Sequence, residues 1–378
     1  MKIATPKEIK PQENRVGLTP GSVRELVGRG HEVFIETGAG AGIGARNTDY
    51  ETAGARILPD ADAVFATGEM IVKVKEPQAA EVGKLRPHHT LFTYLHLAAE
   101  PALTQGLIDS GCTAIAYETV TDDHGGLPLL APMSEVAGRM GAQVAAQCLE
   151  AHAGGKGLLM GGVPGTAPAK VVVLGGGMAG TNAARIAMGM GAEVTILEKS
   201  LPRMRALYDI FGGRIRLIHS TTDSIEAEVT RADVVVGAVL IPGATAPALV
   251  SREMVAAMAP GSVMVDIAID QGGCFATSKP TTHAQPTYTV DGVVHYCVTN
   301  MPGAVPQTST AALNAAVLPY AIALADKGAQ KAMADTPHLA RGLNVIDGAV
   351  AHPAVAQAHN LPLSAPAGAA KQTQEVAA

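Results

Sequence analysis

The stretch Lys170–Lys199, KVVVLGGGMAGTNAARIAMGMGAEVTILEK, decides the fold of this chain. An apolar run leads into a glycine-rich turn, and a helix of small residues and a second apolar run follow. Gly175, Gly177 and Gly180 have the G-x-G-x-x-G spacing. This spacing permits a tight turn, a close approach of the backbone to a pyrophosphate, and close packing of the helix on the strand. Free N–H groups at the start of such a helix attract phosphate, so the stretch predicts a dinucleotide-binding unit.

The second apolar run ends on Glu198, 18 residues after Gly180. A carboxylate at this place accepts hydrogen bonds from the adenosine ribose hydroxyls and repels a 2′-phosphate. A glycine-rich turn is often no more than a tight turn, but here strand, turn, helix, strand and acid follow in order. The cofactor that we expect is NAD.

Downstream of this unit the alternation of strand and helix continues. We expect four further strands, at 214–218, 233–239, 262–267 and 293–298. With the first two they make about six, the number of a doubly wound parallel sheet. Ligands of such sheets bind beyond the carboxyl ends of the strands. The places where we expect cofactor contacts are therefore Ser220, Val239, Leu240, Ala268, Ile269, Asp270, Thr299, Asn300 and Met301.

The first part of the chain has the pattern of another α/β unit, without a glycine fingerprint. Its expected strands are 2–4, 31–36, 69–75, 90–95 and 112–116, with a helix at 20–30. Helical patterns at 134–153 and 308–327 lead into and out of the nucleotide-binding part. We therefore expect an α/β fold of two Rossmann-like doubly wound domains with an active-site cleft between them. The expected domains are 1–130 plus 307–363 for the substrate and 131–306 for NAD, with a disordered tail at 364–378.

The composition limits the classes of function. Only 16% of the 378 residues are charged, the net charge is −6, and no basic run occurs. This balance argues against a nucleic acid partner. So low a charge content suits a protein that buries further surface in a homo-oligomer.

Two long runs without charged residues, 234–251 and 292–325, require a check for membrane spans. Proline and glycine interrupt both runs, so we expect strands, loops and a buried helix there. The N-terminal segment has no signal-peptide core, and the four cysteines form no C-x-x-C pair. We expect a cytoplasmic protein with reduced thiols. The sequence offers no cluster of His and carboxylates for a metal ion.

Two basic motifs carry candidate substrate ligands. Arg15 lies in KEIKPQENRVGLTP, where it is either a solvated charge or a planar clamp for a substrate carboxylate. Lys73 and Lys75 alternate along the apolar segment IVKVKEP. Burying both lysines without partners is costly, and a lysine at the carboxyl end of a strand is a candidate ligand for an anionic or carbonyl oxygen.

Two further motifs carry candidate acid–base groups. His96 follows an apolar strand in LFTYLHLAAE, where it is either a hydrogen-bonded structural residue or a general acid/base beside the strand end of Lys75. Asp270 follows a nucleotide-domain strand in VMVDIAIDQGG. Asp266 is its rival, and its place within the apolar run favours a structural role.

Seven ordered motifs together give the chain a family resemblance, which runs from Met1 to about Pro362. They are KEIKPQENRVGLTP, VKVKEP, YLHLA, PMSEVAGRM, VPGTAPAKVVVLGGGMAGTNAA, DIAIDQGG and NMPGAVPQTSTAALNAA. With them the chain resembles the alanine dehydrogenases, which share ancestry with the NAD-binding subunit of proton-translocating transhydrogenases. The histidine of YLHLA and the loop NMPGAVP have the dehydrogenase form, and the transhydrogenase subunit is the alternative.

The resemblance implies a reversible NAD-dependent oxidative deamination of L-alanine to pyruvate and ammonia. It implies that Arg15 and Lys75 bind the substrate, with Asn300 as a further substrate contact, and that His96 and Asp270 are catalytic. It also implies a homohexamer. The cofactor contacts that we expect in all are Ser134, Gly175, Gly177, Met178, Ala179, Gly180, Glu198, Arg203, Ser220, Val239, Leu240, Ile267, Ala268, Ile269, Asp270, Lys279, Val298, Thr299, Asn300 and Met301.

The chain departs from the family pattern at four places. Glu198 stands where Asp is more usual, Met178 where Val is common, Lys279 where Arg is common, and Gln307 where a basic residue is common. None of these departures removes a candidate catalytic group. They bear on the affinity for the cofactor.

Overall fold

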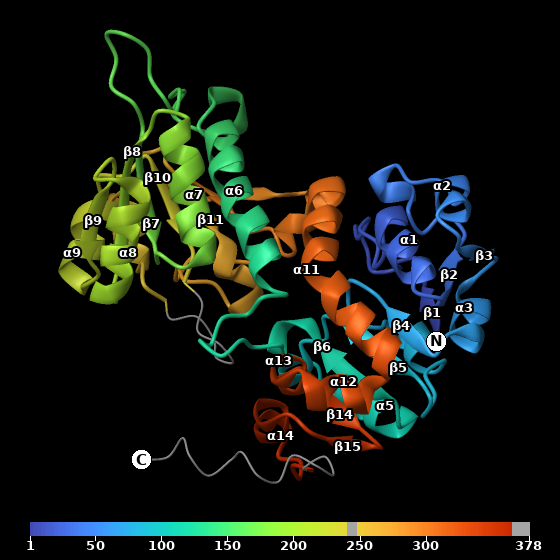
Figure 1. Cartoon of the computed structure of the whole chain (residues 1–378). Helices are drawn as coiled ribbons and strands as arrows, with labels where there is room; N and C mark the ends of the chain where they lie inside the picture. Colours follow the sequence, from blue (N-terminus) through green and yellow to red (C-terminus); the bar gives the residue numbers. More distant parts are fainter. Residues whose placement is uncertain (240–247, 365–378) are drawn as a thin grey trace. The chain divides into compact units, whose positions relative to one another are not determined.

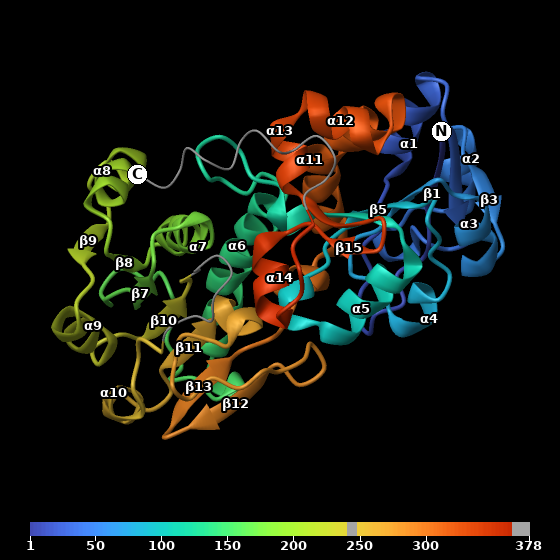
Figure 2. The same cartoon turned by 90° about the horizontal axis from the view of Figure 1, so that it is seen from below.

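The computed structural model describes residues 1–239 and 248–364. The chain divides into two compact units, which we call the first unit (Met1–Pro132 and Val305–Ala378) and the second unit (Met133–Ala304). Each unit is a sheet with helices packed against it (Figures 1 and 2). The expected cofactor residue Leu240 and the tail after Ser364 lie outside the described residues.

The second unit contains a seven-stranded sheet in the order β12-β13-β11-β10-β7-β8-β9. All neighbouring pairs are parallel except β12 with β13. The strands are β7 (Lys170–Leu174), β8 (Glu193–Glu198), β9 (Arg216–His219), β10 (Val234–Gly237), β11 (Val263–Asp266), β12 (Thr287–Val290) and β13 (Val293–Tyr296). The chain runs outward from β7 in one direction and returns to β10 on its other side. The point where a doubly wound sheet binds its ligand therefore lies at the carboxyl ends of β7 and β10.

The helices of the second unit follow the strands in alternation. They are α6 (Ala131–Cys148), which begins in the first unit, α7 (Met178–Gly189), α8 (Leu201–Phe211), α9 (Thr222–Val229) and α10 (Arg252–Ala257), with the 3-10 turns η4 (Ala151–Ala153), η5 (Ile267–Gln271) and η6 (Met301–Ala304). Local sequence sets their starts. The Ser200 hydroxyl caps α8 by accepting from the N–H of Arg203, and a serine or threonine caps α9 and α10 in the same way.

The first unit contains an eight-stranded sheet in the order β15-β14-β6-β5-β4-β1-β2-β3. The strands are β1 (Lys2–Thr5), β2 (Glu32–Glu36), β3 (Arg56–Leu58), β4 (Met70–Val72), β5 (Thr90–Thr93), β6 (Thr113–Ala116), β14 (Leu343–Ile346) and β15 (Ala349–Val350). The six strands from β6 to β3 are parallel, and β14 is antiparallel to β6. The segment after Pro306 thus returns to complete this sheet.

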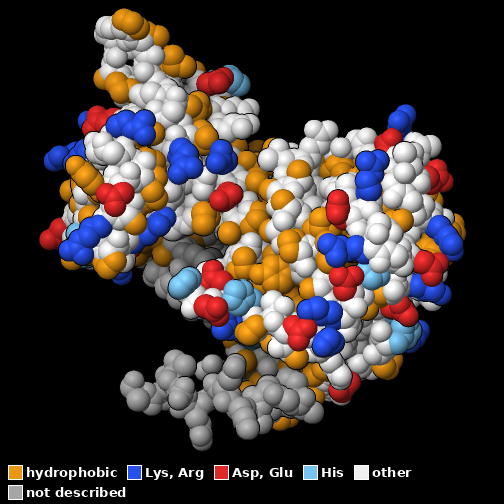
Figure 3. Space-filling view, viewed as in Figure 1, with side chains coloured by type: hydrophobic (Ala, Val, Ile, Leu, Met, Phe, Trp, Pro, Cys, Tyr) orange, Lys and Arg blue, Asp and Glu red, His pale blue; other side chains and the backbone are white. Residues whose placement is uncertain are grey.

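The helices of the first unit come from both of its segments. They are α1 (Pro20–Gly28), α2 (Asn47–Thr52), α3 (Ala61–Thr67), α4 (Ala79–Val82), α5 (Pro101–Ser110), α11 (Pro306–Lys327), α12 (Ala329–Asp335), α13 (Pro337–Arg341) and α14 (Pro353–His359), with the 3-10 turns η1 (Ala41–Ile43), η2 (Leu97–Ala99) and η3 (Tyr117–Thr119). Acidic and basic side chains lie interspersed over both units on the face shown in Figure 3.

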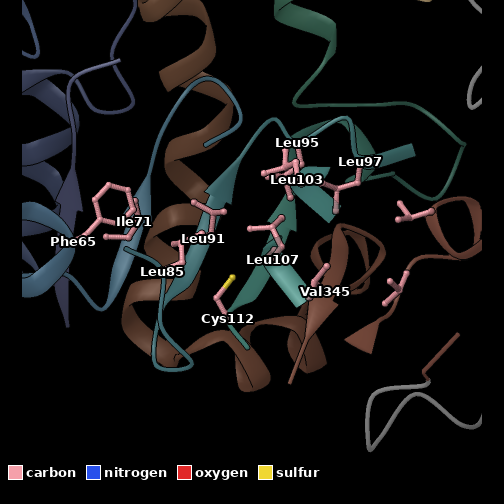
Figure 4. Close-up of a cluster of buried hydrophobic side chains, with 14 of the residues drawn as sticks. Phe65, Ile71, Leu85, Leu91, Leu95, Leu97, Leu103, Leu107, Cys112 and Val345 are labelled. Atoms are coloured by element: carbon pink, nitrogen blue, oxygen red, sulfur yellow. The ribbon is translucent and has the colours of Figure 1, made fainter. Parts of the chain in front are cut away.

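A hydrophobic core lies in the first unit between its sheet and helices (Figure 4). Leu91 comes from β5, Leu103 and Leu107 from α5, and Leu95 and Leu97 from the loop after β5. The last two side chains are 0% and 1% exposed. A full leucine burial contributes about 1.5–3 kcal/mol, so this loop is held to the core at two points.

The predicted fold class is confirmed, while several strand limits are wrong. The expected strand at 69–75 ends at Val72, and the one at 90–95 ends at Thr93. The first N–H group beyond each strand still donates to the neighbouring segment, Lys73 to Phe92 and Tyr94 to Val74. The next N–H groups, of Val74 and Leu95, donate to the carboxylates of Glu8 and Glu118 instead, so the regular ladder ends there. The sequence patterns also missed β3, β12, β14 and β15, which are short and lie at or next to the sheet edges.

Helix α11 is the helix expected at 308–327, and it begins two residues earlier, at Pro306. The helix is long and apolar enough to cross a membrane by length and composition, with a mean hydropathy of 1.3, and 44% of this apolar stretch is buried. Pro302 precedes the helix and Pro306 begins it, while Pro319 lies inside it. Its buried face is partly polar, since the Asn314 amide oxygen accepts from the N–H of Thr19 at 2.9 Å and from the hydroxyl of Ser22 at 2.7 Å. These bonds hold α11 against α1.

Candidate functional site

The glycine turn of the second unit is closed on one side and open on the other. A Cβ on Gly180 would lie 1.9 Å from the carbonyl oxygen of Gly175, whose φ is +93°. Both positions therefore exclude a side chain. A Cβ on Gly177 would meet nothing within 4 Å, and this residue is exposed at the start of α7. The turn thus presents bare backbone and a helix N-terminus outward, which fits a pyrophosphate.

Glu198 and Arg203 hold this turn from the end of β8 and from α8. The two Glu198 carboxylate oxygens accept from the N–H groups of Gly176 and Ser200, each at 2.8 Å. The Arg203 Nε donates to the carbonyl of Gly176 at 2.7 Å, and its guanidinium also donates to the hydroxyl of Thr181. Both residues therefore lie at the turn where the sequence predicted them, and they brace its backbone.

The other expected cofactor residues of the second unit lie near the same end of its sheet. Ser220 follows β9 and donates its N–H to the carbonyl of Glu198 at 3.0 Å, and Val239 follows β10. Lys279 is exposed, and its backbone N–H donates to the Tyr288 hydroxyl. Ser134 lies near the start of α6. The members that lie in or beside η5 and after β13 are Ile267, Ala268, Ile269, Val298, Thr299 and Met301.

Gly138, in the middle of α6, is a residue that sequence reasoning missed. A Cβ at this position would lie 2.1 Å from the carbonyl oxygen of Ala179, so α6 packs directly on the first turn of α7. The available signal was a glycine in the middle of the helical segment PMSEVAGRM, where glycine is costly without a packing reason.

The two aspartates near β11 have different environments. Asp266 is fully buried and accepts from the N–H groups of Ala268 at 3.0 Å and Cys274 at 2.8 Å. Burial raises the pKa of the Asp266 carboxyl, while the Ser278 hydroxyl and Cys274 oppose the rise. Asp270 is exposed on η5. Asp266 therefore braces the loop, and Asp270 is the carboxylate available to a ligand.

Asp270 also holds Asn300. Both carboxylate oxygens of Asp270 lie 3.3 Å from the backbone N of Asn300, whose φ is +56°. The carbonyl of Asn300 lies 3.2 Å from the Nε2 of His283. The structure thus brings together the two polar residues that follow β11 and β13.

Arg15 of the first unit is buried, with 2% of its surface exposed. Its Nε donates to Glu13 Oε1 at 2.7 Å, and its NH2 donates to Glu13 Oε2 at 2.6 Å. The reading of Arg15 as a solvated charge is therefore wrong. Glu13 orients one edge of the guanidinium, and its position two residues before Arg15 was a signal that the sequence analysis did not use.

The two lysines expected on one strand face have separate roles. Lys73 is fully buried, and its ammonium donates to Glu81 at 2.9 Å and to Glu8 at 3.1 Å. Lys75 is half-buried beyond the end of β4. The second oxygen of Glu8 accepts from the N–H of Val74 at 2.7 Å and from that of Lys75 at 3.4 Å. Glu8 therefore links the buried ion pair to the backbone that carries Lys75.

His96 lies in the loop after β5, between the buried Leu95 and Leu97, and its own side chain is exposed. Its φ of 52° and ψ of 36° are left-handed, a conformation that costs a residue other than glycine about 1–2 kcal/mol. Glu118 accepts from the backbone N–H of His96 at 2.6 Å. The imidazole stacks on the Tyr94 ring, with centroids 5.9 Å apart and an interplanar angle of 7°.

The expected substrate residues of the first unit follow three neighbouring parallel strands. Arg15 lies in the loop after β1, Lys75 after β4 and His96 after β5, and the three strands are adjacent in the order β5-β4-β1. The carboxyl ends of parallel strands meet at one edge of the sheet. This edge therefore carries two cations suited to a carboxylate or carbonyl oxygen and one imidazole suited to proton transfer.

Within residues 1–239 and 248–364, no group of three His, Cys, Asp or Glu side chains is placed to hold a metal ion. The absence of a metal ion from the protein remains a prediction.

Comparisons with known proteins place the chain beside one family. The model described as alanine dehydrogenase/PNT, N-terminal domain matches residues 4–137, and the corresponding C-terminal domain matches residues 141–353. The chain is 61% identical to an alanine dehydrogenase of Halomonas elongata, with 96% of this chain and 97% of the relative covered. It is 56% identical to an alanine dehydrogenase of Bacillus subtilis, with 94% of each covered.

Solved structures give the same result. An L-alanine dehydrogenase structure has a TM-score of 0.92 and 53% identity, covering 95% of this chain and 99% of that chain. A transhydrogenase from Sinorhizobium meliloti has a TM-score of 0.81 and 24% identity, covering 93% of this chain and 100% of that chain. The second likeness concerns the fold alone.

Replacing Lys73 by methionine should strongly destabilise the protein. The change removes the ammonium and leaves the carboxylates of Glu8 and Glu81 buried together. We expect the free energy of unfolding at neutral pH, measured with urea, to fall by about 3–5 kcal/mol, because a broken buried ion pair leaves uncompensated charge. Lys84→Met is the matched control. Its ammonium pairs with Asp62, which is largely exposed, so the loss should stay below about 1 kcal/mol.

The loss in Lys73→Met should also depend on pH. Burial already raises the pKa of the Glu8 carboxyl above its usual range, against the lowering effect of Lys73. A carboxyl whose pKa is higher in the folded than in the unfolded state makes the protein more stable as the pH falls through the folded-state pKa. The destabilisation should therefore be smaller near pH 5 than near pH 7. An equal loss at both pH values would contradict this account of the buried charges.

Proposed function

We propose that this chain, which belongs to the alanine dehydrogenase/PNT family, catalyses the reversible NAD-dependent oxidative deamination of L-alanine to pyruvate and ammonia. The observation that carries the proposal is the set of side chains after β1, β4 and β5, which includes Arg15, Lys75 and His96. This set suits a small 2-amino acid, which has a carboxylate to bind and protons to move.

Arg15 and Lys75 would bind the substrate. A guanidinium held at one edge by Glu13 is pre-oriented for a planar carboxylate. Lys75, fixed through its backbone by Glu8, would bind the carboxylate or polarise the carbonyl oxygen of pyruvate. Asn300 would be a further substrate contact.

The glycine turn and the strand ends of the second unit would hold NAD, as the open position at Gly177 and the closed position at Gly180 support. When bound, NAD accepts a hydride from the α-carbon of alanine. The substrate and cofactor residues would hold the α-carbon of alanine and the hydride-accepting carbon of the nicotinamide within about 3.5 Å of each other. Glu198 would face the adenosine ribose. Its carboxylate already accepts two backbone N–H groups, so its charge would remain fixed at the turn.

His96 and Asp270 would carry the proton steps. Loss of a hydride from the α-carbon and of a proton from the nitrogen gives an imine, water adds to form a carbinolamine, and ammonia then leaves to give pyruvate. His96 would exchange protons with the nitrogen and oxygen of these species. Asp270 would orient the attacking water, or ammonia in the reverse direction.

The two compact units support the expected division into a substrate domain and an NAD-binding domain. Residues 1–130 with 307–363 would form the substrate domain, and residues 131–306 would form the NAD-binding domain. The alternative from the sequence analysis, an NAD-binding subunit of a proton-translocating transhydrogenase, has support only from the fold.

An absorbance assay at the NADH band tests the proposed reaction. L-alanine should reduce NAD, and NADP should be used far less efficiently because the carboxylate of Glu198 repels a 2′-phosphate. Glycine, serine and lysine serve as comparison substrates. Absence of L-alanine-dependent NADH formation, together with hydride transfer to a separate NADP-binding protein, would favour the transhydrogenase alternative. Equal efficiency with NADP would contradict the role of Glu198.

Two substitutions test the catalytic residues. His96→Ala and Asp270→Asn should each lower kcat by at least about 10²-fold, the usual contribution of acid–base groups, while NADH binding measured by fluorescence stays nearly unchanged. His124→Ala and Asp209→Asn, at exposed positions, are the matched controls. If either variant keeps more than about a tenth of the wild-type rate, the replaced side chain is not the proposed acid or base.

The protein should be a homo-oligomer, and the family resemblance suggests a hexamer. Leu159 and Val163 are 65% and 55% exposed in the segment before β7, and Met190 nearby is 42% exposed. Gly161 approaches the backbone of Met190, so the segment that carries Leu159 and Val163 lies beside Met190. Light scattering at micromolar concentration should give several times the 38.5 kDa of one chain. A monomeric mass would rule the oligomer out.

A further inference from the structure

We propose that Glu118 is a positioning residue for catalysis, which holds the backbone of His96 in the conformation that turns its imidazole outward. The proposal rests on the proposed function to the extent that His96 is the acid/base. Glu118 itself lies on η3 after β6, and its effect on His96 is exerted through the backbone.

The Glu118 carboxylate accepts hydrogen bonds from the backbone of the loop that carries His96. Oε1 accepts from the N–H of His96 at 2.6 Å, and both oxygens lie 3.2 Å from the backbone N of Leu95. A single carboxylate thus accepts two successive N–H groups. Beyond the end of β5 these groups have left the sheet ladder, and the carboxylate gives both of them a charged acceptor, which makes a stronger hydrogen bond than a neutral one.

The residues on either side of His96 are held by packing. Leu95 and Leu97 are both buried in the hydrophobic core of the first unit (Figure 4). The carbonyl of Leu97 accepts from the Thr104 hydroxyl at 3.0 Å and lies 2.7 Å from the Nε2 of His359. The left-handed conformation at His96 allows both leucines to stay buried while the residue between them is exposed. The backbone before and at His96 depends on Glu118, and the backbone after it depends on these other contacts.

Burial raises the pKa of Tyr94 and lowers that of His352, and the charge of Glu118 adds to the first effect and opposes the second. Tyr94 stacks on His96 and anchors its hydroxyl to the carbonyl of Leu129 at 2.6 Å. Glu118 acts on the backbone of Leu95 and His96 directly, through its hydrogen bonds to their N–H groups. A neutral amide oxygen at the same place retains an acceptor for both N–H groups.

The experiment compares Glu118→Ala, Glu118→Gln and the surface control Glu51→Ala in the full-length protein with L-alanine and NAD. We expect Glu118→Ala to lower kcat by about 10–100-fold, with the KM for L-alanine and the affinity for NADH changed less than about threefold. Glu118→Gln should recover most of kcat, and Glu51→Ala should match the wild type. An equal loss of kcat in the Gln and Ala variants would overturn the proposed acceptor role.

Hydrogen–deuterium exchange of the peptide that contains Leu95 and His96 tests the same bonds without turnover. Protection of this peptide should fall in Glu118→Ala, remain in Glu118→Gln, and remain elsewhere in both variants. Unchanged protection in Glu118→Ala would overturn the proposal, as would lost protection with an unchanged kcat. Absence of wild-type turnover with L-alanine would overturn the proposed function alone, because the exchange result is independent of it.

Discussion

Carboxylates that accept backbone N–H groups where the chain leaves a strand are the interaction on which the rest of this structure depends. Glu8 accepts from Val74 and Lys75, Glu118 from Leu95 and His96, and Glu198 from Gly176 and Ser200. Asp266 accepts N–H groups in the same way after β11, and Asp270 accepts one after β13. Parallel strands end at a common edge, so the N–H groups beyond each end have no ladder partner. A charged acceptor gives hydrogen bonds about twice as strong as neutral ones, which fixes irregular backbone at the edge where ligands of such folds bind.

This arrangement separates the groups that hold the backbone from those that would meet a ligand. Asp266 is buried and braces its loop, while Asp270 four residues later is exposed. Lys73 pairs with Glu8 and Glu81 inside the first unit, while Lys75 lies half-buried beyond them. In each pair, burial and the structural contacts fall on one residue, and its neighbour lies nearer the edge of the sheet where ligands of such folds bind.

The local patterns predicted much of the fold and part of the candidate site. The fingerprint from Gly175 to Gly180 lies on β7 and α7 as expected, because each glycine answers a local backbone requirement. Strand limits were less accurate. Glu118 gave no signal at all, because it lies 22 residues from His96 and the two meet only through the pairing of β5 with β6.

The sequence by itself determined the dinucleotide fold, the family and the residue types after each strand, since these depend on short-range spacing and on ordered motifs. Only the tertiary structure decided which of the two lysines in IVKVKEP is buried. Lys73 and Lys75 have similar local settings, and their roles differ because Glu8, which is distant in sequence, pairs with Lys73 inside the sheet. Burial and charge pairing are properties of the packed sheet, and a carboxylate finds its backbone partners only after the strands have come together.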